Sequence, residues 1–219
     1  SGLRVPLIVR LPNGQMAGTK VEDIVSLMDL GPTVMSLAGI EPPDYMHGKA
    51  FLGKYKSKNP HQYAFGSADR FDEAVDMSRS VIDGRFVYIR NFRPELPLIY
   101  RNAYREQIDM TKTLIEMDQG GELTGGAAYI FMKTKPQEEL YDLAKDPHEM
   151  TNLSENPAFV DKKKELIDLL GKSQIANGDT VSFTAKLLKP LAYNPDTLVR
   201  KPDQWQPDYV LKRYFELKE

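Results

Sequence analysis

Residues 66–91 constrain the fold of this chain more than any other stretch. Within them, Asp83-Gly84 separates residues 80–82, Ser-Val-Ile, from the run Arg-Phe-Val-Tyr-Ile at 85–89. An Asp-Gly pair between two runs of β-branched and aromatic residues is the strongest short-range signal for a β-hairpin, because both turn positions favour a positive φ. The sequence therefore predicts two antiparallel strands here.

The first half of the same stretch is crowded with charge, since Asp69, Arg70, Asp72, Glu73 and Asp76 lie within eight residues. Such a cluster beside a hairpin is typical either of a polar binding rim or of a solvated loop. Carboxylates next to an arginine suit a sugar that bears an anionic group, because carboxylates accept bonds from hydroxyls and the forked guanidinium donates to sulfate or carboxylate. A carboxylate pair for acid–base chemistry and a calcium site are the alternatives, although the EF-hand spacing is absent.

Composition narrows the classes of function. The chain has 219 residues, enough for one large or two small domains, and its net charge of −2 gives no reason to expect a nucleic-acid partner. No run approaches the roughly 20 apolar residues of a membrane span. There is no cysteine, which excludes disulfides, thiolate ligands and cysteine nucleophiles, and three scattered histidines give little support for a zinc site.

Further patterns predict an α/β architecture with an α+β smaller part. Residues 5–9 form an apolar run typical of a strand buried on both faces, and Pro32 begins a helix that Gly39 ends. Apolar residues between 100 and 115 recur at helical spacing, and residues 138–143 indicate a strand. Asn156 caps a helix over 157–170, with Gly171 as its expected stop.

Four segments resemble parts of the sulfatase family, within the alkaline-phosphatase-like superfamily. Residues 2–9, GLRVPLIV, are similar to the family's "GG-x-RVP" strand, and residues 25–33, VSLMDLGPT, resemble "VSLVDLxPT". Residues 38–40 followed by His47-Gly48-Lys49 resemble "AGI…G-[RK]-S". The run ELYDL at 139–143, with DPHE at 146–149, resembles the branch that contains N-sulfoglucosamine sulfohydrolase.

The resemblance implies the organisation of the chain. Residues 1–60 are expected to be the C-terminal end of the catalytic α/β domain, with an alkaline-phosphatase-like sheet. Residues 61–179 are expected to form a small antiparallel sheet with packed helices, and residues 180–219 a tail rich in proline and aromatic residues. The implied location is periplasmic, extracellular or lysosomal.

The resemblance also implies where the chemistry lies. The family's nucleophile is a formylglycine made within a C/S-x-P-x-R motif, which does not occur here, and its Ca²⁺ is held by residues of the N-terminal part. The chain is thus expected to be a C-terminal piece that has no catalytic residue, metal ligand or cofactor of its own and is inactive alone. Its expected partners are a sulfated carbohydrate and the N-terminal catalytic part, with no membrane span.

Substrate contact is the role that the resemblance leaves to this chain. Arg70, Asp72 and Glu73 are the candidates for the rim of the substrate pocket, with Asp69 and His47 behind them. A carbohydrate-binding or structural module without an enzyme, and part of a related phosphodiesterase or phosphatase, remain alternative interpretations.

Overall fold

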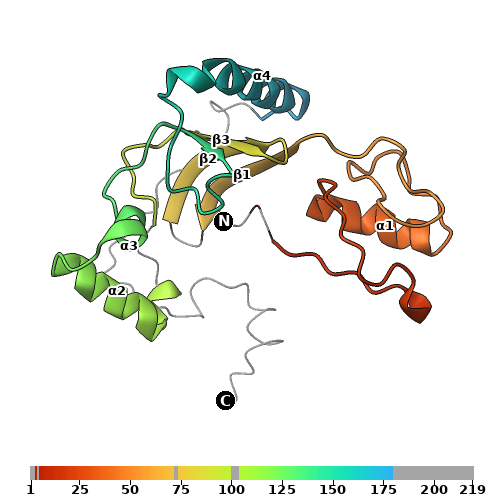
Figure 1. Cartoon of the computed structure of the whole chain (residues 1–219), viewed down its shortest axis with the longest axis horizontal. Coiled ribbons are helices and arrows are strands. Elements are labelled where there is room, and N and C mark those ends of the chain that lie inside the picture. The colour runs from red at the N-terminus through yellow and green to blue at the C-terminus, as the bar shows by residue number, and fades with distance from the viewer. Residues whose placement is uncertain (1–2, 4, 72–73, 100–103, 180–219) are drawn as a thin grey trace, which may run out of the picture. The chain divides into compact units, whose positions relative to one another are not determined.

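The computed structural model describes residues 3, 5–71, 74–99 and 104–179 (Figure 1). The described residues divide into two compact units. The first unit comprises those of residues 1–68, 78–92 and 136–181, and the second comprises those of residues 69–77 and 93–135. Four strands share one sheet in the order β1-β2-β3-β4: β1 (Ala64–Phe71), β2 (Ala74–Ile82), β3 (Phe86–Asn91) and β4 (Glu138–Asp142).

Among the described residues, the helices are short except for the last one. They are α1 (Leu30–Leu37), α2 (Asp109–Gln119), α3 (Gly125–Ile130) and α4 (Val160–Ala176), with 3-10 turns at Pro12–Gly14, Leu27–Asp29, Arg105–Gln107 and Pro157–Phe159.

The predicted hairpin is confirmed, but its turn differs from the prediction. Strands β2 and β3 pair antiparallel, with Ile82 opposite Val87. Of the turn residues only Gly84 has a positive φ, of 91°. The reason is the Asp83 carboxylate, whose Oδ1 accepts the backbone N–H of Arg85 at 3.0 Å and of Phe86 at 2.6 Å. Asp83 therefore closes the turn with its side chain instead of occupying a turn centre.

One face of the sheet is covered by α4, which lies across the strands in Figure 1. Its core consists of buried side chains from β2, β3, β4 and α4, among them Val81, Tyr88, Leu140, Leu166 and Leu170. The register places Val81 opposite Tyr88 and Tyr88 opposite Leu140, so that these side chains share the face beneath α4. The predicted small antiparallel sheet with a helix packed on it is thus confirmed for the hairpin, β4 and α4.

The opposite face of the sheet has a smaller apolar cluster and a polar row. Val87, Tyr141 and Leu143 are buried there. Next to them, the buried Glu139 carboxylate accepts the Asn91 side-chain N–H at 2.5 Å and the Tyr141 hydroxyl at 2.6 Å. A buried carboxylate is costly unless its oxygens accept hydrogen bonds, and these two donors meet that need.

The free edge of β4 is paired by a side chain instead of a strand. The Asn152 Oδ1 accepts the N–H of Leu140 at 3.0 Å, and its Nδ2 donates to the carbonyl of Glu138 at 3.0 Å. The backbone N–H of Leu153 donates to the Leu140 carbonyl at 2.8 Å. Polar groups of the edge strand are thereby satisfied, which removes a site for unwanted strand pairing.

Three other predictions need correction. Residues 5–9 join no strand of the described chain, and Ile8 is 91% exposed, because a strand requires a hydrogen-bonded neighbour and none lies beside this run. The last helix continues through Gly171 to Ala176, since a glycine within a helix costs only about 1 kcal/mol. The helix predicted around 100–115 begins at Asp109; residues 100–103 lie outside the described residues.

Candidate functional site

The charged cluster lies on two strand ends. Asp69 and Arg70 belong to β1, where Asp69 is half-buried, and Asp76 belongs to β2. Asp72 and Glu73 lie outside the described residues. The sequence interpretation placed the cluster in a loop before the hairpin, whereas the backbone of Asp69 and Arg70 is part of the sheet, which fixes its course more firmly than a loop would.

Asp76 anchors this segment within the second unit. Its Oδ2 forms an ion pair with the ammonium of Lys135, whose side chain is only 2% exposed. The backbone N–H of Lys135 in turn donates to the carbonyl of Pro94 at 3.0 Å. The Asp76 Oδ1 is buried and has no hydrogen-bond partner. Removal of one partner of a buried ion pair lowers the free energy of unfolding by several kcal/mol. This contact therefore ties the start of β2 to residues 93–135.

His47 is exposed on the loop that follows Pro42-Pro43, and the residues beside it are structural. A Cβ on Gly48 would lie 2.1 Å from the carbonyl oxygen of Met28, so that only glycine permits this approach of the two backbones. The next residue, Lys49, donates its backbone N–H to the Asp29 carboxylate at 2.7 Å. The His-Gly-Lys motif therefore holds the loop against the turn that precedes α1.

The Asp29 cluster, made of Asp29 with Ser26, Lys49 and His61, was not predicted from the sequence. Asp29 is 1% exposed, and its carboxylate also accepts the N–H of Ser26 at 2.8 Å and lies 2.9 Å from the His61 Nε2. Behind it, the Thr33 hydroxyl donates to the Asp29 carbonyl at 2.6 Å. One carboxylate thus joins three chain segments, which is a structural role. The available signal was an aspartate just before a helix with proline in its first turn, but its histidine partner lies 32 residues away.

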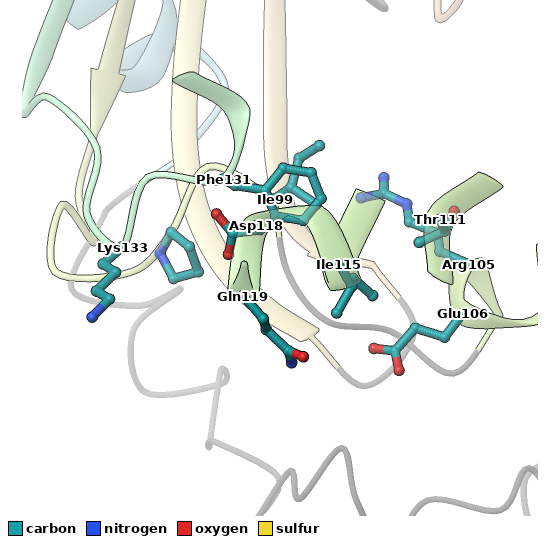
Figure 2. Close-up of a pocket in the computed structure, with 10 residues that line it drawn as sticks. Ile99, Arg105, Glu106, Thr111, Ile115, Asp118, Gln119, Phe131 and Lys133 are labelled. Carbon is teal, nitrogen blue, oxygen red and sulfur yellow. The ribbon is translucent and has the colours of Figure 1, made fainter. Parts of the chain in front are cut away.

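The second unit contains an open cavity of about 340 Å³. Its apolar wall is formed by Pro97, Ile99, Ile115 and Phe131. Its polar groups come from a 3-10 turn, α2 and the segment after α3, and they are Arg105, Glu106, Thr111, Asp118, Gln119 and Lys133. In Figure 2, Arg105 and Lys133 lie on opposite sides of the lining residues, with Ile115 and Phe131 between them. The cavity was missed from the sequence because Ile115 belongs to a helical stripe that indicates core packing, whereas Pro97, Ile99 and Phe131 come from separate segments of the chain.

Two further carboxylates form ion pairs with arginines of the sheet region, and one of them, Asp142, belongs to the run ELYDL. The Arg85 guanidinium donates to both oxygens of Asp142, at 2.9 and 2.7 Å, and this lowers the pKa of the Asp142 carboxyl below its ordinary value of 3.8. The pKa of Asp179 is lowered in the same way by the buried Arg79, which binds it at 2.6 and 2.9 Å. Both carboxylates close salt bridges within the first unit, so neither is suited to acid–base catalysis.

No metal site appears among the residues that the structure describes, since no three histidine, aspartate or glutamate side chains gather there. Within the same ranges, no helix has both the length and the apolar character needed to cross a membrane.

The sheet and the α4 layer make this a mixed α/β region, and comparison with known proteins gives the family. The family model for the C-terminal part of N-sulphoglucosamine sulphohydrolase matches residues 1–73. An ulvan-active sulfatase of Formosa agariphila is 41% identical over 183 residues, which are 84% of this chain and 30% of that protein. N-sulphoglucosamine sulphohydrolase of Homo sapiens is 28% identical over 187 residues, covering 79% of this chain and 37% of the human protein.

The chain belongs to the sulfatase family and is homologous to the C-terminal region of its members. It spans about a third of the length of these two relatives. A solved structure of a 2-O GAG sulfatase aligns with a TM-score of 0.47 and 21% identity, covering 78% of this chain and 32% of that one.

Proposed function

We propose that the protein to which this chain belongs is a sulfatase that hydrolyses sulfate esters or sulfamates of a sulfated carbohydrate. The observation that carries the proposal is the 41% identity over 183 residues with an ulvan-active sulfatase. The nucleophile, a formylglycine, and the Ca²⁺ belong in this proposal to the part of the protein that corresponds to the rest of the relatives. The chain alone is then inactive, and the protein is periplasmic, extracellular or lysosomal.

Within that enzyme, the chain supplies scaffold and part of the pocket rim. Arg70, Asp72 and Glu73 form the rim in this proposal, and Asp69 and His47 lie behind them. Support comes from the sheet, which fixes the backbone of Asp69 and Arg70, and from the buried ion pair of Asp76 in the next strand. A guanidinium on a fixed backbone is well suited to sulfate, because its parallel N–H groups match two oxygens of the anion.

The catalytic part is the proposed partner of the first sixty residues. Leu30, Val34 and Leu37 lie at i, i+4 and i+7 of α1 and are 38%, 65% and 52% exposed. Apolar surface of this extent normally marks a contact with another folded part. In this proposal the catalytic part covers this helix face and the apolar run 5–9, which accounts for the exposed apolar side chains of both.

The test uses the longer protein and measures release of sulfate from ulvan and from defined sulfated oligosaccharides. Arg70→Ala is expected to lower kcat/KM about tenfold to a hundredfold, because a charge-assisted hydrogen bond contributes about 1.5–3 kcal/mol. The melting temperature should stay unchanged. Arg93→Ala is the control, because Arg93 pairs with the exposed Glu95 and a surface ion pair of this kind contributes little.

Two results would contradict the proposal. Absence of sulfate release from every sulfated carbohydrate by the longer protein would contradict the activity. Equal loss of thermal stability and of turnover in Arg70→Ala would contradict the role of the rim and indicate a purely structural arginine.

A further inference from the structure

The cavity of the second unit has the composition of a carbohydrate site. Sugar rings offer an apolar face and a ring of hydroxyls, and proteins bind them with a flat apolar surface and with planar polar side chains that both donate and accept. Here Phe131 and Ile115 supply the apolar surface, and Asp118, Gln119 and Arg105 supply planar polar groups. The volume of about 340 Å³ lies within the range of small-molecule sites.

The two cations specify the kind of sugar. Lys133 is exposed and Arg105 is half-buried, and Figure 2 shows them on opposite sides of the apolar surface. Cations at both ends of an apolar surface suit a ligand with an anionic group at either end, such as a sulfated disaccharide that contains a uronic acid. The carboxylates of Glu106 and Asp118 also line the cavity, where they are placed to accept bonds from sugar hydroxyls.

We infer that this cavity is a second carbohydrate-binding site, which takes an acidic disaccharide unit of the substrate polymer away from the bond that is hydrolysed. The inference rests on the proposed function for the class of sugar. It adds a site beyond the rim, because neither Asp69 nor His47, the two candidate residues whose side chains the structure describes, lines the cavity. Such a site raises the affinity for a polymer without entering the chemical step, since a second contact makes the first one effectively intramolecular.

The test measures binding of sugar probes to the 219-residue chain, with backbone amide NMR as the readout. The probes are a sulfated disaccharide prepared from ulvan and the same disaccharide after chemical removal of sulfate. We expect chemical-shift changes at Thr111, Ile115 and Gln119. Lys133→Gln should weaken binding of the sulfated probe about tenfold, the lower end for the loss of one hydrogen bond to a charged group, and change binding of the desulfated probe much less.

Two further variants make the result specific. Lys112→Gln is the matched control. Lys112 lies on α2, the helix that carries the lining residues Thr111 and Ile115, but its ammonium pairs with Asp109 at 2.9 Å and does not line the cavity. Phe131→Leu keeps an apolar side chain but removes the flat ring, so that both probes should bind more weakly by a similar factor. Amide spectra of each variant without ligand show whether its fold is retained.

Three outcomes would overturn the inference: shift changes confined to other parts of the chain, equal weakening by Lys112→Gln and Lys133→Gln, or equal binding of the two probes by the unmodified chain. Sulfate release by the longer protein is measured separately on a sulfated monosaccharide. Normal release together with an unresponsive cavity removes the second site and leaves the proposed activity in place. Absence of sulfate release together with specific binding in the cavity removes the proposed activity and leaves the second site in place.

Discussion

Replacement of Asp29 by alanine gives the sharpest test of how residues 24–61 are held together. The substitution removes the acceptor for the N–H groups of Ser26 and Lys49 and the partner of His61, at distances of 2.7–2.9 Å. An unsatisfied buried donor costs about 1–3 kcal/mol. The lower end applies here, because these bonds are only partly buried, and three lost contacts then give about 3 kcal/mol.

The loss should be local and is measured best by hydrogen exchange of single amides. A change of about 3 kcal/mol corresponds to roughly a hundredfold faster exchange at Lys49 and Ser26, since each 1.4 kcal/mol is a factor of ten. Val87 belongs to the sheet core and should retain its protection.

Asp29→Asn is the matched variant for this test. It keeps the shape of the side chain and one acceptor oxygen, but its NH₂ group must face one of the two N–H donors. Exchange should therefore accelerate by an intermediate factor of about ten. Unchanged exchange at Lys49 in Asp29→Ala would refute the reasoning, and so would an equal acceleration at Val87, which would show that the cluster stabilises the whole unit and not one loop.

Two predictions concern the sheet. Leu166 projects from α4 into the core between this helix and the sheet and is fully buried, so Leu166→Ala should lower the free energy of unfolding, measured by urea titration, by about 2–5 kcal/mol. Ile167→Ala, at an exposed position of the same helix, should lower it by less than about 1 kcal/mol. Equal effects of the two substitutions would contradict the assigned core. The bond from Arg85 lowers the pKa of Asp142, so the unfolded state binds more protons in acid and stability should fall as the pH drops below about 4; Arg85→Gln should flatten this dependence between pH 5 and 2, and an unchanged slope would contradict the ion pair.

Local sequence signals predicted the elements whose partners are near in the chain. The β2–β3 hairpin and α1 follow from residues within a few positions of one another. The Asn156 side chain accepts the N–H of Ala158 as predicted for a cap, but it caps the 3-10 turn Pro157–Phe159, and the α-helix itself begins only at Val160. The turn at Gly84 was displaced from its predicted centre because a side-chain acceptor, Asp83, competes with the backbone, and propensities do not include that bond.

Contacts between distant segments were beyond local signals. Asp29 and His61 are 32 residues apart, and Asp76 and Lys135 are 59 apart. Such pairs depend on how the chain is routed, which periodicity does not determine. The strand expected at residues 5–9 shows the same limit, because hydrophobicity alone indicates burial but not the neighbour against which the strand would pair.

The motifs that identify the family are built into the scaffold. Gly48 permits a backbone contact, Asp29 joins three segments and Asp142 closes an ion pair. Each of these contacts lies within the scaffold and stabilises the fold independently of the substrate.

Residues that select a sugar face a different constraint, because they must change when the polymer changes. On this reasoning, specificity belongs to side chains outside the motifs, and the two sites proposed above, the charged strand ends and the cavity of the second unit, are where we expect them in this chain. Substitutions in the motifs should then alter stability with all substrates alike. Substitutions at Arg70 or Lys133 should alter the ranking of substrates while the stability of the fold stays the same.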